Sequence, residues 1–210
     1  MVCLLKIKLK SAATQNSSVW AGGTTTELLI YPEDSSYQAR DFFVRISSAA
    51  VELEKSDFTK LPGITRYIMP LRGSMKLEHF AQDDSCFAYA ELSPFEVHRF
   101  DGGWGTVSHG VCTDFNLMLA EGWGGGMKTL ADGDVIACEP NELLCVYSLK
   151  PLSIFLRDEV HELLPGDALC VENSAELVQA ATKGGDGVLA VIARATKSYP
   201  TLSVSSVVVP

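Results

Sequence analysis

Short runs in which hydrophobic and polar residues alternate recur along the chain, separated by turn-forming residues. Alternation with a period of two is typical of strands with one buried face, and few segments show the period of a helix. The runs cover residues 24–31, 42–51, 66–71 and 107–119 in the first half, and 143–149, 153–156, 168–172 and 188–195 in the second. About ten short strands of this kind predict an all-β barrel or sandwich.

A glycine-rich segment separates the two groups of runs. Residues 122–126 read Gly-Trp-Gly-Gly-Gly, and we expect that three consecutive glycines cannot hold a regular strand. We therefore divide the chain into residues 1–120 and 121–210. Residues 174–183 are ambiguous, because they fit a short helix with Ser174 as its N-cap and Gly184 after its end, but equally a strand.

Composition and charge exclude several classes of protein. The 210-residue chain is 47% hydrophobic and 20% charged, which argues against disorder, and its formal net charge of -9 disfavours nucleic acid and anionic membranes as partners. At the N-terminus, Lys6, Lys8 and Lys10 alternate with apolar residues, as in an amphipathic strand and unlike a signal peptide. No stretch has the roughly 18 apolar residues of a membrane span. The six cysteines form no CxxC pair and are interpreted as reduced thiols, most of them in the core.

Charged side chains interrupt two of the predicted strands. Asp114 and Asn116 share one face of their strand, while apolar residues occupy the other. Arg45 lies in an apolar strand, and a buried arginine needs a carboxylate partner or an anionic ligand. A fixed internal ion pair with Glu27 or Asp114 and an exposed polar face are the alternatives to a binding site.

Other residues extend this candidate pocket. Arg66 follows the turn at Pro62 and Gly63 and leads into another strand. Thr25 and Glu27 fall on one strand face, although threonine also favours strands for purely local reasons. Trp20 is either a core anchor or a wall that stacks on a planar ligand.

A turn in the second half resembles a feature of cupin barrels. Pro165, Gly166 and Asp167 join two apolar runs, as in the second conserved turn of cupins. Metal-binding cupins usually carry a histidine about ten residues later, where this chain reads Glu-Leu-Val-Gln at 176–179. The second half therefore resembles a cupin barrel without a metal.

Several longer strings, in a fixed order, resemble the HutD/Ves family. They are VWAGGTTTELLIYP (19–32), FFVRISSAAVE (42–52), SDFTKLPGITRYIMPLRG (56–73), LSPFEVHRFDGG (92–103) and DFNLM (114–118). The resemblance implies an all-β bicupin, two fused double-stranded β-helix (jelly-roll) barrels, in a cytoplasmic bacterial protein. It also implies a link to histidine utilisation or stress response, binding of a small pathway metabolite, and no established catalytic reaction. Ala21 and Gly103 depart from residues that are common in the family.

Residues and resemblance together lead to one functional hypothesis and one alternative. We expect a non-catalytic protein without a cofactor, whose first barrel binds a small carboxylate such as N-formylglutamate. The predicted ligand-binding residues are Trp20, Thr25, Glu27, Arg45, Arg66, Asp114 and Asn116. The exposed strand edges of such barrels could also pair two copies as a homodimer.

The alternative is a metal-dependent cupin enzyme that acts on a small metabolite. The chain has four histidines, none of which forms the HxH pair that opens the usual cupin metal motif. The best remnant is Glu96 with His98, possible partners being His79 and His109. We therefore predict that the protein holds no metal.

Overall fold

The fold was determined as a computed structural model, which describes residues 5–173 and 177–198. Within these two ranges every regular element is a β-strand. The predicted all-β class is therefore confirmed. The described residues contain no helix long and apolar enough to cross a membrane.

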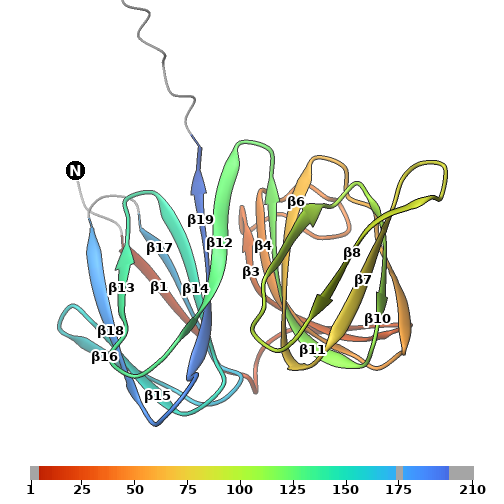
Figure 1. Ribbon diagram of the computed structural model, residues 1–210. Coiled ribbons are helices and arrows are strands. Elements are labelled where there is room, and N and C mark those ends of the chain that lie inside the picture. Colours follow the sequence, from red (N-terminus) through yellow and green to blue (C-terminus); the bar gives the residue numbers. More distant parts are fainter. Residues whose placement is uncertain (1–4, 174–176, 199–210) are drawn as a thin grey trace, which may run out of the picture.

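The first half of the molecule consists of two antiparallel sheets that share a core (Figure 1). The larger sheet has, in spatial order, β2 (Ser17–Trp20), β3 (Gly23–Tyr31), β4 (Val44–Val51), β11 (Cys112–Ala120), β6 (Ile64–Gly73) and β9 (His98–Asp101). The smaller sheet has β5 (Lys55–Phe58), β10 (Gly105–His109), β7 (Met75–Phe80) and β8 (Cys86–Leu92).

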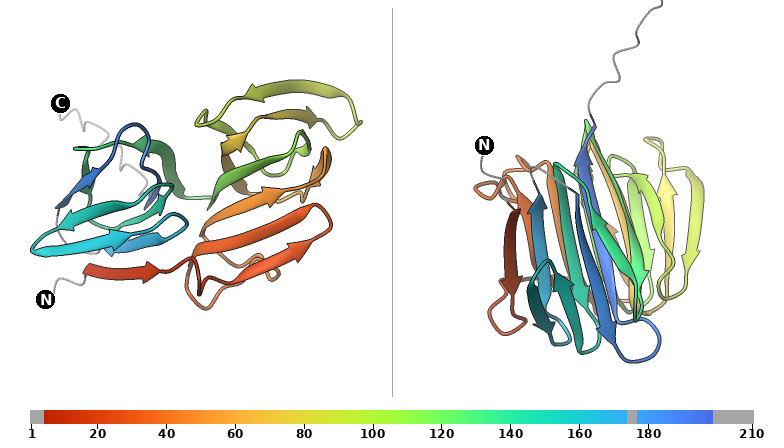
Figure 2. Two further views of the ribbon diagram at one scale, coloured as in Figure 1. Left: turned by 90° about the horizontal axis from the view of Figure 1, so that it is seen from below. Right: turned by 90° about the vertical axis from the view of Figure 1, so that its left-hand side faces the viewer.

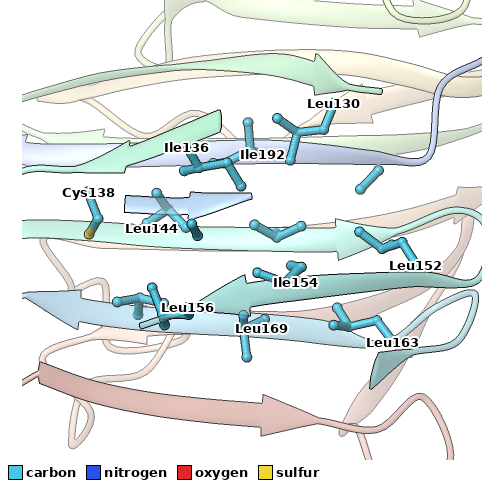
Figure 3. Close-up of a cluster of buried hydrophobic side chains, with 14 of the residues drawn as sticks. Leu130, Ile136, Cys138, Leu144, Leu152, Ile154, Leu156, Leu163, Leu169 and Ile192 are labelled. Carbon is cyan, nitrogen blue, oxygen red and sulfur yellow. The ribbon is translucent and has the colours of Figure 1, made fainter. Parts of the chain in front are cut away.

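The second half repeats this arrangement. Its larger sheet has β1 (Leu5–Lys10), β17 (Ala168–Asn173), β14 (Glu142–Ser148), β19 (Ala190–Lys197) and β12 (Trp123–Leu130). Its smaller sheet has β13 (Val135–Cys138), β18 (Val178–Gly184), β15 (Leu152–Leu156) and β16 (Glu159–Leu163). Leucine and isoleucine side chains fill the space between the two sheets, among them Leu144, Ile154, Leu169 and Ile192 (Figure 3).

The first strand lies in the sheet of the second half. β1 pairs antiparallel with β17, from Leu5 opposite Asn173 to Lys10 opposite Ala168, and Leu5 and Ile7 pack against the second core. The amphipathic pattern of residues 5–10 thus produces a strand, as expected. The structure differs from the predicted division in placing this strand with the C-terminal residues.

The two larger sheets pack against each other where the halves meet (Figure 2). Phe115 and Leu117 of β11 and Ile46 of β4 form one apolar cluster with Leu143 of β14 and Ala193 of β19. Because side chains alternate along a strand, the neighbouring residues of β4 and β11 point to the opposite face, toward the smaller sheet of the first half. The polar residues of these strands are thereby enclosed.

The four sheets have open strand orders, with β2 and β9 at the edges of the largest. The closed barrels of the predicted bicupin therefore stay a prediction. The ambiguous segment is a strand from Val178 onward, while residues 174–176 lie outside the described ranges.

Candidate functional site

A cavity of about 390 Å³ lies inside the first half. Its walls come from the large sheet, from the segment around Tyr37 and from the end of β5 at Phe58. Six of the seven predicted ligand-binding residues line it: Trp20, Thr25, Arg45, Arg66, Asp114 and Asn116. The sequence stretches that hold them are far apart in the chain, and strand pairing brings them together.

The register of the large sheet explains this convergence. Met118 of β11 pairs with Arg45 on one side and Arg66 on the other, so both arginines lie in the same row of the sheet. The next enclosed row contains Asn116 opposite Ser47. Side chains in adjacent enclosed rows point the same way, so guanidinium, amide and hydroxyl groups share one space.

Two bulges flank the cavity. The register shifts in β3 between Glu27 and Leu29, and both Leu28 and Leu29 join the apolar cluster between the halves. A second shift occurs where Asp114 of β11 pairs with Pro70 of β6. Proline cannot donate a ladder hydrogen bond and fits such a bulge. The first bulge turns both Leu28 and Leu29 to the apolar cluster while Glu27 keeps the face of Thr25, and the second lies in β6 opposite Asp114.

Arg45 is fixed by neighbours of its own chain. Its Nε donates to Glu27 Oε2 at 2.8 Å and its Nη1 to Ser47 Oγ at 3.2 Å. The guanidinium lies 4.5 Å from the centre of the Tyr37 ring, a cation–π arrangement. The ion pair with Glu27 is the internal pair that the sequence left open. Glu27 itself does not line the cavity and acts on it through Arg45.

Arg66 is buried without a carboxylate in hydrogen-bonding contact. Its Nη2 donates to Asn116 Oδ1 at 3.3 Å, and its guanidinium lies 4.5 Å from the Phe58 ring centre and 5.4 Å from that of Phe100. Its Nε is buried and has no hydrogen-bond partner. Burial lowers the pKa of Arg66 to about 10, with Arg45 adding to the effect and Tyr37 and Asp114 opposing it.

Asp114 is a buried acidic residue of the cavity beside the two buried arginines, with only 2% of its surface exposed. Asn116 Nδ2 donates to Asp114 Oδ1, so the amide of Asn116 bridges Asp114 and Arg66. Burial raises the pKa of Asp114 to about 7, against the influence of Arg66 and of the Asn116 hydrogen bond. Near neutral pH this carboxyl group therefore exists in both protonation states.

Trp20 lies at the open side of the cavity. Its indole Nε1 donates to Thr25 Oγ1 at 3.1 Å, and 38% of the residue is exposed. The ring lies over Gly22, where an added Cβ would collide with it. Trp20 is therefore a half-exposed wall of the cavity and not a core anchor.

The sequence pattern predicted most of the residues that line the cavity but not the aromatic rings that contact its arginines. Tyr37, Phe58 and Phe100 contact the two arginines. Phe58 and Phe100 lie within the strings that resemble the HutD/Ves family, but the sequence pattern did not assign them to the pocket. The arginines themselves were the only signal, since a buried guanidinium often stacks on an aromatic ring. That the seven residues bind a ligand stays a prediction.

The histidines do not form a metal centre of the cupin type. His79 Nε2 and His98 Nε2 are 2.9 Å apart and share a hydrogen bond, while His79 Nδ1 contacts Thr106 Oγ1 at 3.0 Å. Glu96 accepts from the backbone of Ser93 instead of joining His98. The described residues contain no group of three or more His, Cys, Asp or Glu side chains placed to hold a metal ion. Two histidines whose facing nitrogens are bonded to each other do not fit the metal implied by the alternative hypothesis.

With the geometry established, comparison with known proteins adds the family. The family model for HutD matches residues 12–189, most of the chain. The chain belongs to the HutD family. No curated protein matches its sequence.

Solved structures show the same fold at low sequence identity. A conserved protein of unknown function from Pseudomonas aeruginosa PAO1 has a TM-score of 0.77 and 21% identity, covering 92% of this chain and 100% of its own. HutD from Pseudomonas fluorescens SBW25, in a formate condition, has a TM-score of 0.73 and 20% identity, and the match covers 92% of this chain and 100% of that chain. A formate complex of Lactobacillus farciminis oxalate decarboxylase has a TM-score of 0.60 and 7% identity, and the match covers 95% of this chain and 88% of that chain. These similarities establish a cupin-like fold.

Proposed function

We propose that this HutD-family protein is a non-catalytic receptor for a small carboxylate, which binds in the cavity of the first half. A metabolite of histidine breakdown such as N-formylglutamate fits this class. Binding would report the level of the metabolite inside the cytoplasm and so regulate histidine utilisation or a stress response. The proposal includes the two barrels of a bicupin, each half being one of them.

The single observation that carries the proposal is the state of Arg66. Its guanidinium is buried, stacks on two aromatic rings and has an Nε without a hydrogen-bond partner. Leaving a buried donor unsatisfied costs roughly 1–3 kcal/mol, and more for a charged group. A ligand carboxylate would accept from this Nε in a charge-assisted hydrogen bond and remove that cost.

The rest of the cavity supports a carboxylate with a polar extension. Arg45 is held rigid by Glu27 and Tyr37, so it can contact a ligand without losing side-chain entropy. Asn116 and Asp114 offer an amide and a carboxyl group for a formamide or amino group. A formate condition is named for HutD from Pseudomonas fluorescens and a formate complex for the oxalate decarboxylase, and formate is the smallest carboxylate.

Isothermal titration calorimetry with N-formylglutamate, glutamate and formate tests the proposal. We expect at least one of these three carboxylates to bind. The compound in which its carboxylate is replaced by an amide should bind far more weakly. Arg45→Ala and Arg66→Gln should each weaken binding by roughly 2–4 kcal/mol, because a desolvated ion pair is lost. Arg99→Ala is the matched control, because Arg99 is exposed on β9. No heat with any of these carboxylates at millimolar concentration, or equal affinity in Arg66→Gln and Arg99→Ala, would refute the proposal.

The net charge and the strand edges indicate which partners other than a small molecule we expect. The formal net charge of -9 supports the absence of nucleic acid and membrane partners. A homodimer through strand edges stays a prediction, and analytical ultracentrifugation at micromolar concentration would test it.

A further inference from the structure

Two cysteines face each other where the halves of the molecule meet. Cys145 of β14 and Cys170 of β17 are direct partners in the antiparallel register, and their sulfur atoms are 3.6 Å apart. Directly opposed residues of antiparallel strands have Cα atoms roughly 4.5–5.5 Å apart, within the range that disulfides span. Small side-chain rotations would therefore suffice to join these sulfur atoms, without a rearrangement of the sheet.

A second cavity gives access to this pair. It has a volume of about 260 Å³, lies between β1, β3 and β17, and is lined by Cys170 together with Lys6, Lys8 and Lys10. Cys145 does not line the cavity and is fully buried. A small oxidant that enters can thus reach one sulfur atom, and the other lies immediately behind it.

The surroundings give the two thiols different reactivity. The hydrogen-bonding contact with Cys145 lowers the pKa of Cys170, against the effect of burial and with help from the positive charges of Lys10 and Lys8. The same contact, together with burial, raises the pKa of Cys145 well above its usual value. Because the thiolate is the nucleophile, Cys170 is the attacking sulfur and Cys145 the resolving one.

We propose that Cys145 and Cys170 form a peroxide-oxidisable thiol pair, a redox modification site separate from the carboxylate cavity. The Cys170 thiolate attacks one oxygen of hydrogen peroxide, the O–O bond breaks, and after protonation of the leaving hydroxide the products are a Cys170 sulfenic acid and water. The Cys145 thiol then attacks the sulfenic sulfur, the S–O bond breaks, and a second water leaves. The two thiols lose two electrons and two protons in total, and the peroxide is reduced to two waters.

Formation of the disulfide would remove a hydrogen bond between Cys170 and strand β3. In its thiol form Cys170 Sγ donates to the backbone carbonyl of Leu28 at 3.4 Å, at the bulge that follows Glu27. A disulfide has no S–H and removes this hydrogen bond. The modification thus acts at the strand that also supplies Thr25 and Glu27.

Peptide mapping of the full chain tests the proposal. The background is Cys3→Ser with Cys86→Ser, since Cys86 is exposed and Cys3 lies outside the described residues. After treatment with hydrogen peroxide below the unfolding temperature, we expect a non-reduced digest to yield a cross-linked peptide containing Cys145 and Cys170, about 2 Da lighter than the two thiol peptides together. Cys112 and Cys138 are internal controls, because both are buried and burial raises their pKa values to about 12 and about 11. Both should stay reduced.

A second variant identifies the order of the steps. In Cys145→Ala the resolving thiol is missing, and we expect dimedone to trap a sulfenic acid on Cys170. If Cys145→Ala does not fold, the peptide map of the Cys3→Ser, Cys86→Ser protein alone decides. Cys145 and Cys170 that remain fully alkylatable after peroxide treatment and unfolding, or oxidation of all four buried thiols at one rate, would overturn the proposal.

Discussion

The Nη2 of Arg66 donates to Asn116 Oδ1 at 3.3 Å, while the Nε of the same guanidinium is buried without a partner. The Nη2 of this arginine is thus held in place, while its Nε is left for a hydrogen-bond acceptor from outside the chain. An arginine kept only for stability would have no reason to leave a buried donor unpaired, because the apolar space around it could be filled by an apolar side chain. Stability and binding should therefore respond differently to its replacement.

Replacing Arg66 by Met separates these two effects. We expect the free energy of unfolding to change by less than about 2 kcal/mol, since a buried guanidinium without a carboxylate partner is exchanged for an apolar chain of similar length. Carboxylate binding should disappear. Urea denaturation and calorimetry on the same variant measure the two quantities. A large loss of stability would show that Arg66 is a structural residue.

Asp114 should make the stability of the protein depend on pH. Its folded-state pKa of about 7 lies above the usual aspartate value of 3.8, so between these values the folded state holds a proton that the unfolded chain has released. The stability contributed by the protonated carboxyl group is full below pH 3.8 and is lost as pH rises toward 7. The loss amounts to roughly 4 kcal/mol at most. Denaturation of wild type and Asp114→Asn between pH 4 and pH 8 should show this slope only in the wild type.

Ligand binding should depend on the same group. A bound carboxylate adds negative charge beside Asp114 and favours its protonated form, so binding takes up a proton near neutral pH. We expect affinity to fall as pH rises above 7, by up to about tenfold for each pH unit. Titrations in buffers of different ionisation enthalpy would reveal the proton uptake. An affinity that is unchanged from pH 6 to pH 8 would contradict this expectation.

Gly22→Ala should displace Trp20 from the cavity wall. The indole ring occupies the place of the missing Cβ, and its hydrogen bond to Thr25 fixes it there. Because Trp20 is partly exposed, we expect a shift in tryptophan fluorescence and a several-fold loss of carboxylate affinity, with little change in stability. Gly63→Ala is unsuitable as a control because Gly63 has a φ of +79°, whereas Gly126 has open space around it and no such backbone constraint. Gly126→Ala should therefore leave both fluorescence and affinity unchanged.

In the second half, Glu142→Ala should destabilise the protein by about 2–4 kcal/mol. Arg194 donates to both carboxylate oxygens of Glu142, at 2.7 and 2.9 Å, and Glu142 is only 3% exposed. Removing one partner leaves the other charge without compensation in a largely buried setting. Thermal denaturation measures the effect, and Glu33→Ala is the control because its pairs with Lys6 and Lys8 lie on the surface. Equal melting temperatures for the two variants would show that the Glu142 pair adds no stability.

The alternating pattern sufficed to predict the strands, because period two is a local property of the backbone. Residues 5–10 and 24–31 are strands as expected, whereas the predicted run 107–119 is divided between β10 and β11 in different sheets. The glycines at 124–126 lie within β12, because pairing with β19 holds them in a strand. The partner of a strand is set by packing far away in the sequence. The pairing of β1 with β17 could not be derived from the residues of either strand.

The same distinction holds for the cavity. Arg45 and Asp114 were conspicuous because charge in an apolar strand must be compensated, and this requirement is visible in sequence. Which group compensates is decided by register. Glu27 pairs with Arg45 because alternation along β3 places it on the enclosed face with Thr25, while Asn116 lies between Arg66 and Asp114. Tyr37 and Phe58 approach from segments outside the large sheet, and no spacing rule marks them.

The position of β1 imposes an order on folding during synthesis. β1 leaves the ribosome before the other described strands, but β17, its partner among them, begins at Ala168, so this edge of the second sheet cannot form until β17 has been made. The sheets of the first half need no residue beyond Ala120 and can form in the meantime. A ribosome that stalls between the halves would therefore hold the formed cavity of the first half together with β1, which would still be unpaired. β19 is made later still, and its pairing with β12 and β14 brings Ala193 against Phe115 and Leu117 of β11, which joins the two halves.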